Sequence, residues 1–233
     1  MAEVKLTVHR ALALKKTTEQ RISEAIEPVM SGSSFIAVRQ GRKTTINGVP
    51  VEKIETDIRA KYDKVLQLIS NYKKLKKALL QSNAGLEGDA NVRTVTVAGK
   101  PYTMAELIDA SDNIYGNKKH SRAFLPVFLA TLKSEYSMAT RQIENAHAKV
   151  EQDIKDYLAK AAGNDKALTT DDIKKRSEMF HEDGDKHLVD PLNLKNVIEK
   201  LENEIKTFRV DCDATMSEQN ALTTVSVDLT DVE

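Results

Sequence analysis

Two histidines enclose an acidic stretch late in the chain, and this segment offers the best candidate chemistry. Imidazole nitrogens and carboxylate oxygens both bind divalent metal ions. The candidate ligands are His181, His187, Asp183 and Asp185. Their spacing matches no standard metal-binding motif, so we interpret the segment as a polar loop between two helices. We therefore expect no metal and no cofactor.

Two other segments with candidate chemistry are better interpreted as parts of the fold than as functional sites. Gly41-Arg42-Lys43-Thr44 resembles the end of a phosphate-binding loop, but the pattern needs a glycine where Ile36 stands. A hairpin loop is the better interpretation. Cys212 is the only cysteine and falls on the apolar stripe of a helix, which predicts a small core residue. We expect no catalytic residue, and the chain is predicted not to be an enzyme.

Charge gives no global attraction to nucleic acid or to an anionic membrane. The chain has 35 basic and 35 acidic residues, for a formal net charge of zero. Basic clusters at 73–77 and 117–122 could meet phosphate, but cations near a helix C-terminus also complement the helix dipole. We do not expect nucleic acid as a partner.

Four long helices should position these residues, because apolar side chains recur at alternating steps of three and four. The helices are predicted from about residue 7 to 28, from 51 to 82, from about 120 to 162, and from 190 to about 220, with a shorter one from 170 to 180. Asp190-Pro191 is predicted as the capping residue and first residue of the last helix. The expected packing or oligomer seam comprises Ile58, Val65, Leu68, Leu75, Leu132, Tyr136, Ile143, Val150, Leu201 and Ile205.

Short β segments interrupt the helices, at 35–38, 44–46 and 92–97, and a closing strand is predicted at 225–229. Residues 45–51 and 96–102 share a pattern of Thr, a β-branched residue, any residue, Gly, any residue, Pro and a large apolar residue. Two interpretations stay open: chance convergence on the same turn chemistry, or two related units.

These elements predict a mainly α fold with small β elements (α+β). We expect an antiparallel coiled-coil bundle of long helices capped by a small antiparallel sheet. The unit 1–163 would hold the repeat, and 164–233 would pack on the same bundle. The sequence shows neither a signal peptide nor a run of about 20 apolar residues, so we expect no membrane association.

Two passages resemble known proteins. In 79–108 a charged helix ends in Asn-Ala, and Thr103-Met104-Ala105-Glu106-Leu107-Ile108 opens the next helix. This passage resembles septicolysin-like coiled-coil proteins of bacteria and their phages. The stretch 217–225 resembles the tail of uncharacterised tailed-phage proteins. The resemblance implies a coiled-coil fold and a phage origin, in the bacterial cytoplasm or the virion.

Three functions follow for testing. The first is a non-enzymatic structural or interaction protein, a homo-oligomer associated with a phage virion or its assembly, whose partners are its own copies or other phage or bacterial proteins. The second is a phage-encoded protein that binds and modulates a host factor. The third is a metal-dependent enzyme built on His181 and His187, which would need further carboxylates from the fold.

Overall fold

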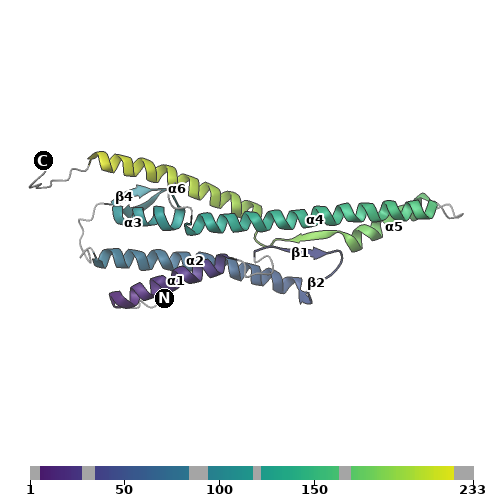
Figure 1. Ribbon diagram of the computed structural model, residues 1–233, viewed down its shortest axis with the longest axis horizontal. Helices are drawn as coiled ribbons and strands as arrows, with labels where there is room; N and C mark the ends of the chain where they lie inside the picture. Colours follow the sequence, from purple (N-terminus) through teal and green to yellow (C-terminus); the bar gives the residue numbers. More distant parts are fainter. Residues whose placement is uncertain (1–5, 28–34, 84–93, 118–121, 163–168, 223–233) are drawn as a thin grey trace, which may run out of the picture. The chain divides into compact units, whose positions relative to one another are not determined.

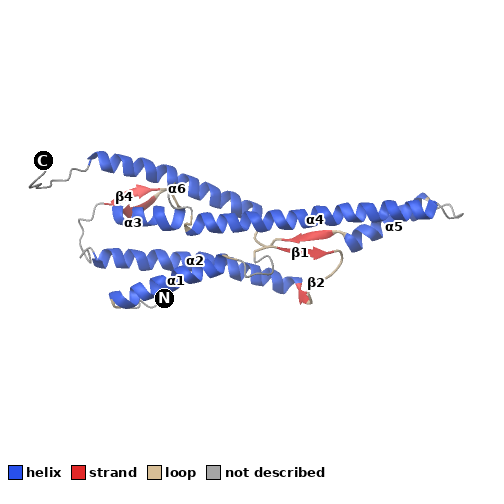
Figure 2. Cartoon of the chain, in the orientation of Figure 1, coloured by secondary structure: helices blue, strands red, loops and turns tan. Residues whose placement is uncertain are grey.

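Long helices make up most of the structure, a computed structural model that describes residues 6–27, 35–83, 94–117, 122–162 and 169–222 (Figures 1 and 2). The fold is mainly α with small antiparallel β elements, as predicted. The helices are α1 (Val8–Ile26), α2 (Val51–Asn83), α3 (Met104–Asp109), the π-helix η1 (Ala110–Tyr115), α4 (Phe124–Ala162), α5 (Thr170–Gly184) and α6 (Leu194–Leu222).

The β residues of the described ranges form three separate two-stranded antiparallel pairs and not one capping sheet. These pairs are β1 (Ala37–Gln40) with β6 (Lys186–Val189), β2 (Thr45–Ile46) with β3 (Val49–Pro50), and β4 (Thr94–Val97) with β5 (Lys100–Thr103). The first pair joins residues far apart in the chain, whereas the other two are local hairpins.

The chain divides into two compact units whose segments interleave. Unit 1 contains Met1–Ile22, Leu68–Val127 and Lys200–Glu233, and unit 2 contains Ser23–Gln67 and Phe128–Glu199. Both units therefore draw on residues before and after position 163, where the sequence suggested a division. The unit boundaries fall inside α1, α2, α4 and α6, because each of these helices is long enough to contribute to more than one cluster of contacts.

The repeated pattern produces the same hairpin twice. Both central turn residues have positive φ, at 49° and 80° for Asn47 and Gly48 and at 48° and 73° for Ala98 and Gly99. This is the tight two-residue turn whose twist matches that of the flanking strands. Threonine faces proline across both hairpins, in the pairs Thr45–Pro50 and Thr96–Pro101. The turn chemistry is confirmed, and common descent of the two units stays open.

Local capping starts α3 at Thr103, the residue with which the sequence opens this helix. The Thr103 side chain accepts from the Glu106 N–H at 3.2 Å, and the Glu106 carboxylate accepts from the Thr103 N–H at 2.9 Å. This capping box satisfies backbone donors that the helix leaves without partners. The helix continues as η1 and ends at Gly116, whose φ of 71° suits glycine.

The predicted polar loop at 181–187 was wrong. Helix α5 continues to Gly184 instead of ending near residue 180, and strand β6 begins at Lys186. The strand forms because β1 supplies its hydrogen-bonding partner, with His187 opposite Arg39. The local composition favoured a loop, but pairing with β1, a strand from the first quarter of the chain, favours a strand more strongly.

The start of α6 was also misplaced. The helix begins at Leu194, and Pro191 lies in the preceding turn. Asp190 still caps the helix, because its carboxylate accepts from the Leu194 N–H at 2.7 Å. The chain turns at Asn193, which has a positive φ of 54°, between the Asp190 carboxylate and the Leu194 N–H that it accepts from.

The expected seam faces the interior. Its buried members are Ile58, Val65, Leu132, Val150, Leu201 and Ile205, and its half-buried members are Leu68, Leu75, Tyr136 and Ile143. On α4 the deeply buried stripe also takes in Phe128 and Glu135, which are 0% and 1% exposed. The seam is thus covered within the chain, and little of it is left to join a second chain.

Several sequence predictions fall outside the described residues. These are the closing strand at 225–229, the strand residue at 92 and the middle of the basic cluster at 117–122.

Candidate functional site

Two helices of unit 2 come close enough to bring chemically active side chains together. On α4, His147, Val150 and Glu151 share one face, because residues three and four apart are neighbours on a helix. The last turn of α5 presents His181 and Gly184 in the same way. A Cβ atom on Gly184 would lie 2.4 Å from the Cγ2 atom of Val150, so only glycine allows this approach. The close packing sets the distance between the two histidines.

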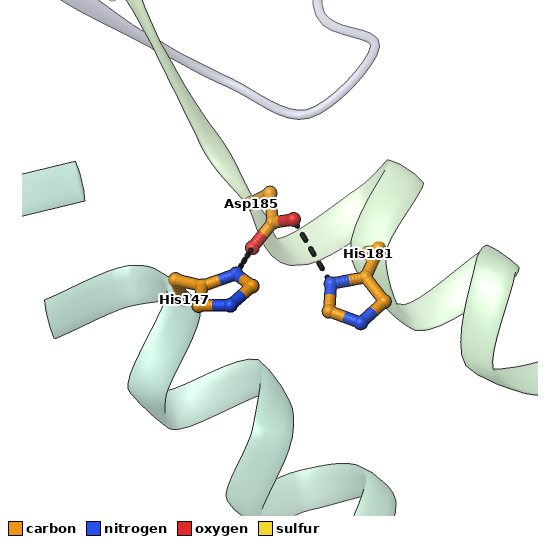
Figure 3. A group of neighbouring side chains, drawn as sticks. All are labelled: His147, His181 and Asp185. Carbon is orange, nitrogen blue, oxygen red and sulfur yellow. Dashed lines mark hydrogen bonds and ion pairs between the residues drawn. The ribbon is translucent and has the colours of Figure 1, made fainter. Parts of the chain in front are cut away.

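The Asp185 carboxylate lies between the two imidazole rings (Figure 3). Its Oδ1 is 3.2 Å from Nδ1 of His147, and its Oδ2 is 2.9 Å from Nδ1 of His181. The ring centroids are 5.4 Å apart and the ring planes differ by 27°. One nitrogen or oxygen atom from each of these residues lies within 4.8 Å of the other two.

A second carboxylate fixes the far side of His181. Its Nε2 is 3.3 Å from Oε1 of Glu151, so each ring nitrogen of His181 faces a carboxylate. The side chains remain open to solvent, at 58% exposure for His147, 32% for His181 and 21% for Asp185. Burial raises the pKa of the Asp185 carboxyl, but hydrogen bonds from His181 and His147 outweigh it and hold that pKa below its usual value.

The backbone of Asp185 is held from both directions. Its N–H donates to the His181 carbonyl at 2.9 Å, and its carbonyl accepts from the Gly41 N–H at 2.6 Å. Arg42, next in the chain, forms an ion pair with Glu182. The segment that resembled a phosphate-binding loop therefore follows β1 as a turn and braces the end of α5.

The structure brings together some of the residues that the sequence singled out as metal ligands and separates others. His181 and Asp185 belong to the cluster. His187 lies on β6 opposite Arg39, and exposed Asp183 is outside the group. His147 is not among the ligands that the sequence predicts; it is exposed, and it faces the other two. The only signal for it was a histidine followed four residues later by Glu151.

A second group of titratable residues in unit 1 serves packing. Lys73 Nζ lies 5.1 Å from the ring centroid of Tyr115, and burial lowers the pKa of Lys73. Lys76 pairs with Asp109 at 2.7 Å and Lys77 lies 3.7 Å from Glu106. The three lysines, Glu106 and Asp109 line a small cavity of about 120 Å³. Three lysines of the basic cluster are thus engaged with partners inside unit 1.

Cys212 is 1% exposed, with its Sγ atom 3.6 Å from the Met216 sulfur. Burial raises the pKa of its thiol, which keeps the reactive thiolate scarce at neutral pH. We expect the folded protein to resist alkylation by iodoacetamide over hours and the denatured protein to be labelled fully. Mass spectrometry gives the labelled fraction, and rapid labelling of the folded protein would contradict the core assignment.

The first half of α1 carries an apolar surface of a different kind. Four large apolar residues in or just before this half of the helix are between 40% and 49% exposed: Leu6, which precedes α1, and Val8, Leu12 and Leu14. Val8 lies on the same stripe as Ile22, two heptads further on, and Ile22 is 0% exposed. The stripe that is covered at Ile22 is therefore uncovered near the start of the helix.

Comparison of the chain with protein-family models, with curated proteins and with solved structures found no match. The helices of the described residues include none that is both long and apolar enough to cross a membrane. The functional argument consequently rests on the chain's own geometry.

Proposed function

We propose that the chain is a non-enzymatic structural or interaction protein that assembles with copies of itself through the first half of α1. The exposed residues Leu6, Val8, Leu12 and Leu14 support this proposal. The setting, from the sequence resemblance, is a tailed phage, in the virion or its assembly in the bacterial cytoplasm.

The net charge of the chain does not oppose a second copy as the partner. With 35 basic and 35 acidic residues, the protein has no net charge to repel its own copies or to attract a strongly charged partner. An unpaired stripe on a helix is also typically covered by a like stripe from another helix.

The association should be weak. Val8 and Leu12 lie one turn apart and share a face of α1, whereas Leu14 lies on the other side of the helix. Covering half of a large apolar side chain contributes on the order of 1 kcal/mol, so these two residues from each of two copies contribute about 4 kcal/mol. Loss of translational and rotational freedom opposes this by at least about 4 kcal/mol. The two terms nearly cancel, so we expect association only at millimolar protein concentrations or above.

We expect the double substitution Val8→Glu with Leu12→Glu to abolish concentration-dependent assembly. Glutamate in the first turns of α1 is favoured by the helix dipole, and α1 has no acidic residue in its first turn, so the variant should fold. Light scattering from micromolar to millimolar protein should show a mass that rises above the monomer value of 26.0 kDa for the parent. The mass of the variant should stay at 26.0 kDa over the same range.

Val210→Glu is the matched control, because Val210 is 62% exposed on α6, away from α1 in sequence. It should assemble like the parent. A parent that stays monomeric throughout the concentration range, or a control that loses assembly as the double variant does, would contradict the proposal.

A further inference from the structure

We propose that His147, His181 and Asp185 form a binding site for a divalent transition-metal ion of the zinc class, which links α4 to the end of α5. The site lies within unit 2. It would exist in a single chain, whether or not the protein assembles through α1.

The donor atoms select the class of ion. Two imidazole nitrogens and one carboxylate oxygen form a mixed nitrogen and oxygen set, which suits Zn²⁺, Co²⁺ and Ni²⁺. Magnesium and calcium prefer oxygen ligands alone. Three protein ligands leave a fourth position to water, and the 58% exposure of His147 leaves that position open to solution.

The donor atoms lie close enough for rotation of their side chains to bring them around one ion. Bonds of about 2.1 Å at tetrahedral angles place neighbouring ligand atoms about 3.4 Å apart. The Nδ1 atoms of His147 and His181 lie 3.2 Å and 2.9 Å from the two different oxygens of Asp185, and one donor atom from each residue lies within 4.8 Å of the other two. An ion bound there would take the Nδ1 lone pairs, so each neutral imidazole would carry its proton on Nε2, where that of His181 would donate to Glu151.

The surrounding contacts orient the ligands in advance. His181 directs Nδ1 toward Asp185 and Nε2 toward Glu151, which is how ligating histidines are commonly held by a second carboxylate. Asp185 is fixed through backbone hydrogen bonds to His181 and Gly41. Gly184 and Val150 hold α5 against α4. These contacts restrain His181 and Asp185, and the packing of Gly184 on Val150 holds them beside the helix that carries His147.

The test is titration of untagged, chelator-treated full-length protein with Zn²⁺ by calorimetry and with Co²⁺ by visible absorption. We expect one equivalent to bind per chain and to raise the thermal unfolding midpoint. His147→Ala and His181→Ala should each abolish this binding and the midpoint shift. Glu151→Gln should weaken it by about 10- to 100-fold while keeping the stoichiometry.

His187→Ala is the matched control, since His187 is an exposed histidine on the neighbouring strand β6. It should bind like the parent. Circular dichroism without metal establishes that each variant is folded. Absence of saturable binding in the parent, or equal loss in His187→Ala and His147→Ala, would overturn the site and leave a hydrogen-bonded histidine–aspartate cluster.

Discussion

Replacing Gly41 by alanine is expected to lower the free energy of unfolding by about 3 kcal/mol. A Cβ atom at this position would lie 2.6 Å from the Glu182 carbonyl oxygen and 2.7 Å from that of Asp183. Both oxygens belong to backbone and cannot rotate away. Gly41 also has a φ of 49°, which disfavours any residue with a side chain. Urea denaturation followed by circular dichroism measures the loss.

Gly48→Ala separates the two causes. Gly48 has a φ of 80°, but a Cβ atom there would meet nothing within 4 Å. It should therefore cost only the conformational strain, about 1 kcal/mol. Equal losses for Gly41→Ala and Gly48→Ala would show that the close approach to α5 does not exist in solution.

The Gly41 substitution should also disturb the histidine cluster, because the Gly41 N–H donates to the Asp185 carbonyl. Shifts of the imidazole proton signals of His147 and His181 in the NMR spectrum would report this, with His9 on α1 as the internal reference. The coupling follows from geometry: the turn after β1 contacts the same last turn of α5 that presents the ligands.

Glu135→Ala is expected to destabilise the protein by about 3 kcal/mol. The Glu135 side chain is only 1% exposed, and its carboxylate accepts from the Phe35 N–H at 2.9 Å. Removing it leaves a buried donor without this acceptor and opens space in the core of unit 2. Denaturant unfolding of parent and variant gives the difference.

Two comparison variants sharpen this result. Glu135→Gln keeps an acceptor oxygen of similar size and should lose less than Glu135→Ala. Glu144→Ala removes an exposed carboxylate from the same helix and should change stability by less than about 0.5 kcal/mol. If Glu135→Ala were as mild as Glu144→Ala, the buried hydrogen bond to Phe35 would not contribute.

Sequence alone determined the elements whose causes are local. Asn47-Gly48 forms the turn that its residue types predict, since tight hairpins need positive φ at adjacent positions, and in the second hairpin Gly99 supplies this preference while Ala98 takes a positive φ against it. Thr103 and Glu106 cap α3 as expected. The long helices α2, α4 and α6 follow their apolar spacing, because the three-four pattern is a property of the helix itself.

Only the tertiary structure decided the candidate site. Strand β6 forms because β1 pairs with it. Its residues, Lys186–Val189, follow an acidic segment and show no strand pattern of their own. Glu135 is buried because the Phe35 amide needs an acceptor, although glutamate reads as a surface residue. His147 lies 38 residues before Asp185, and close packing of Gly184 on Val150 brings them together. A histidine's neighbours across the fold are set by such packing, which no spacing in the sequence encodes.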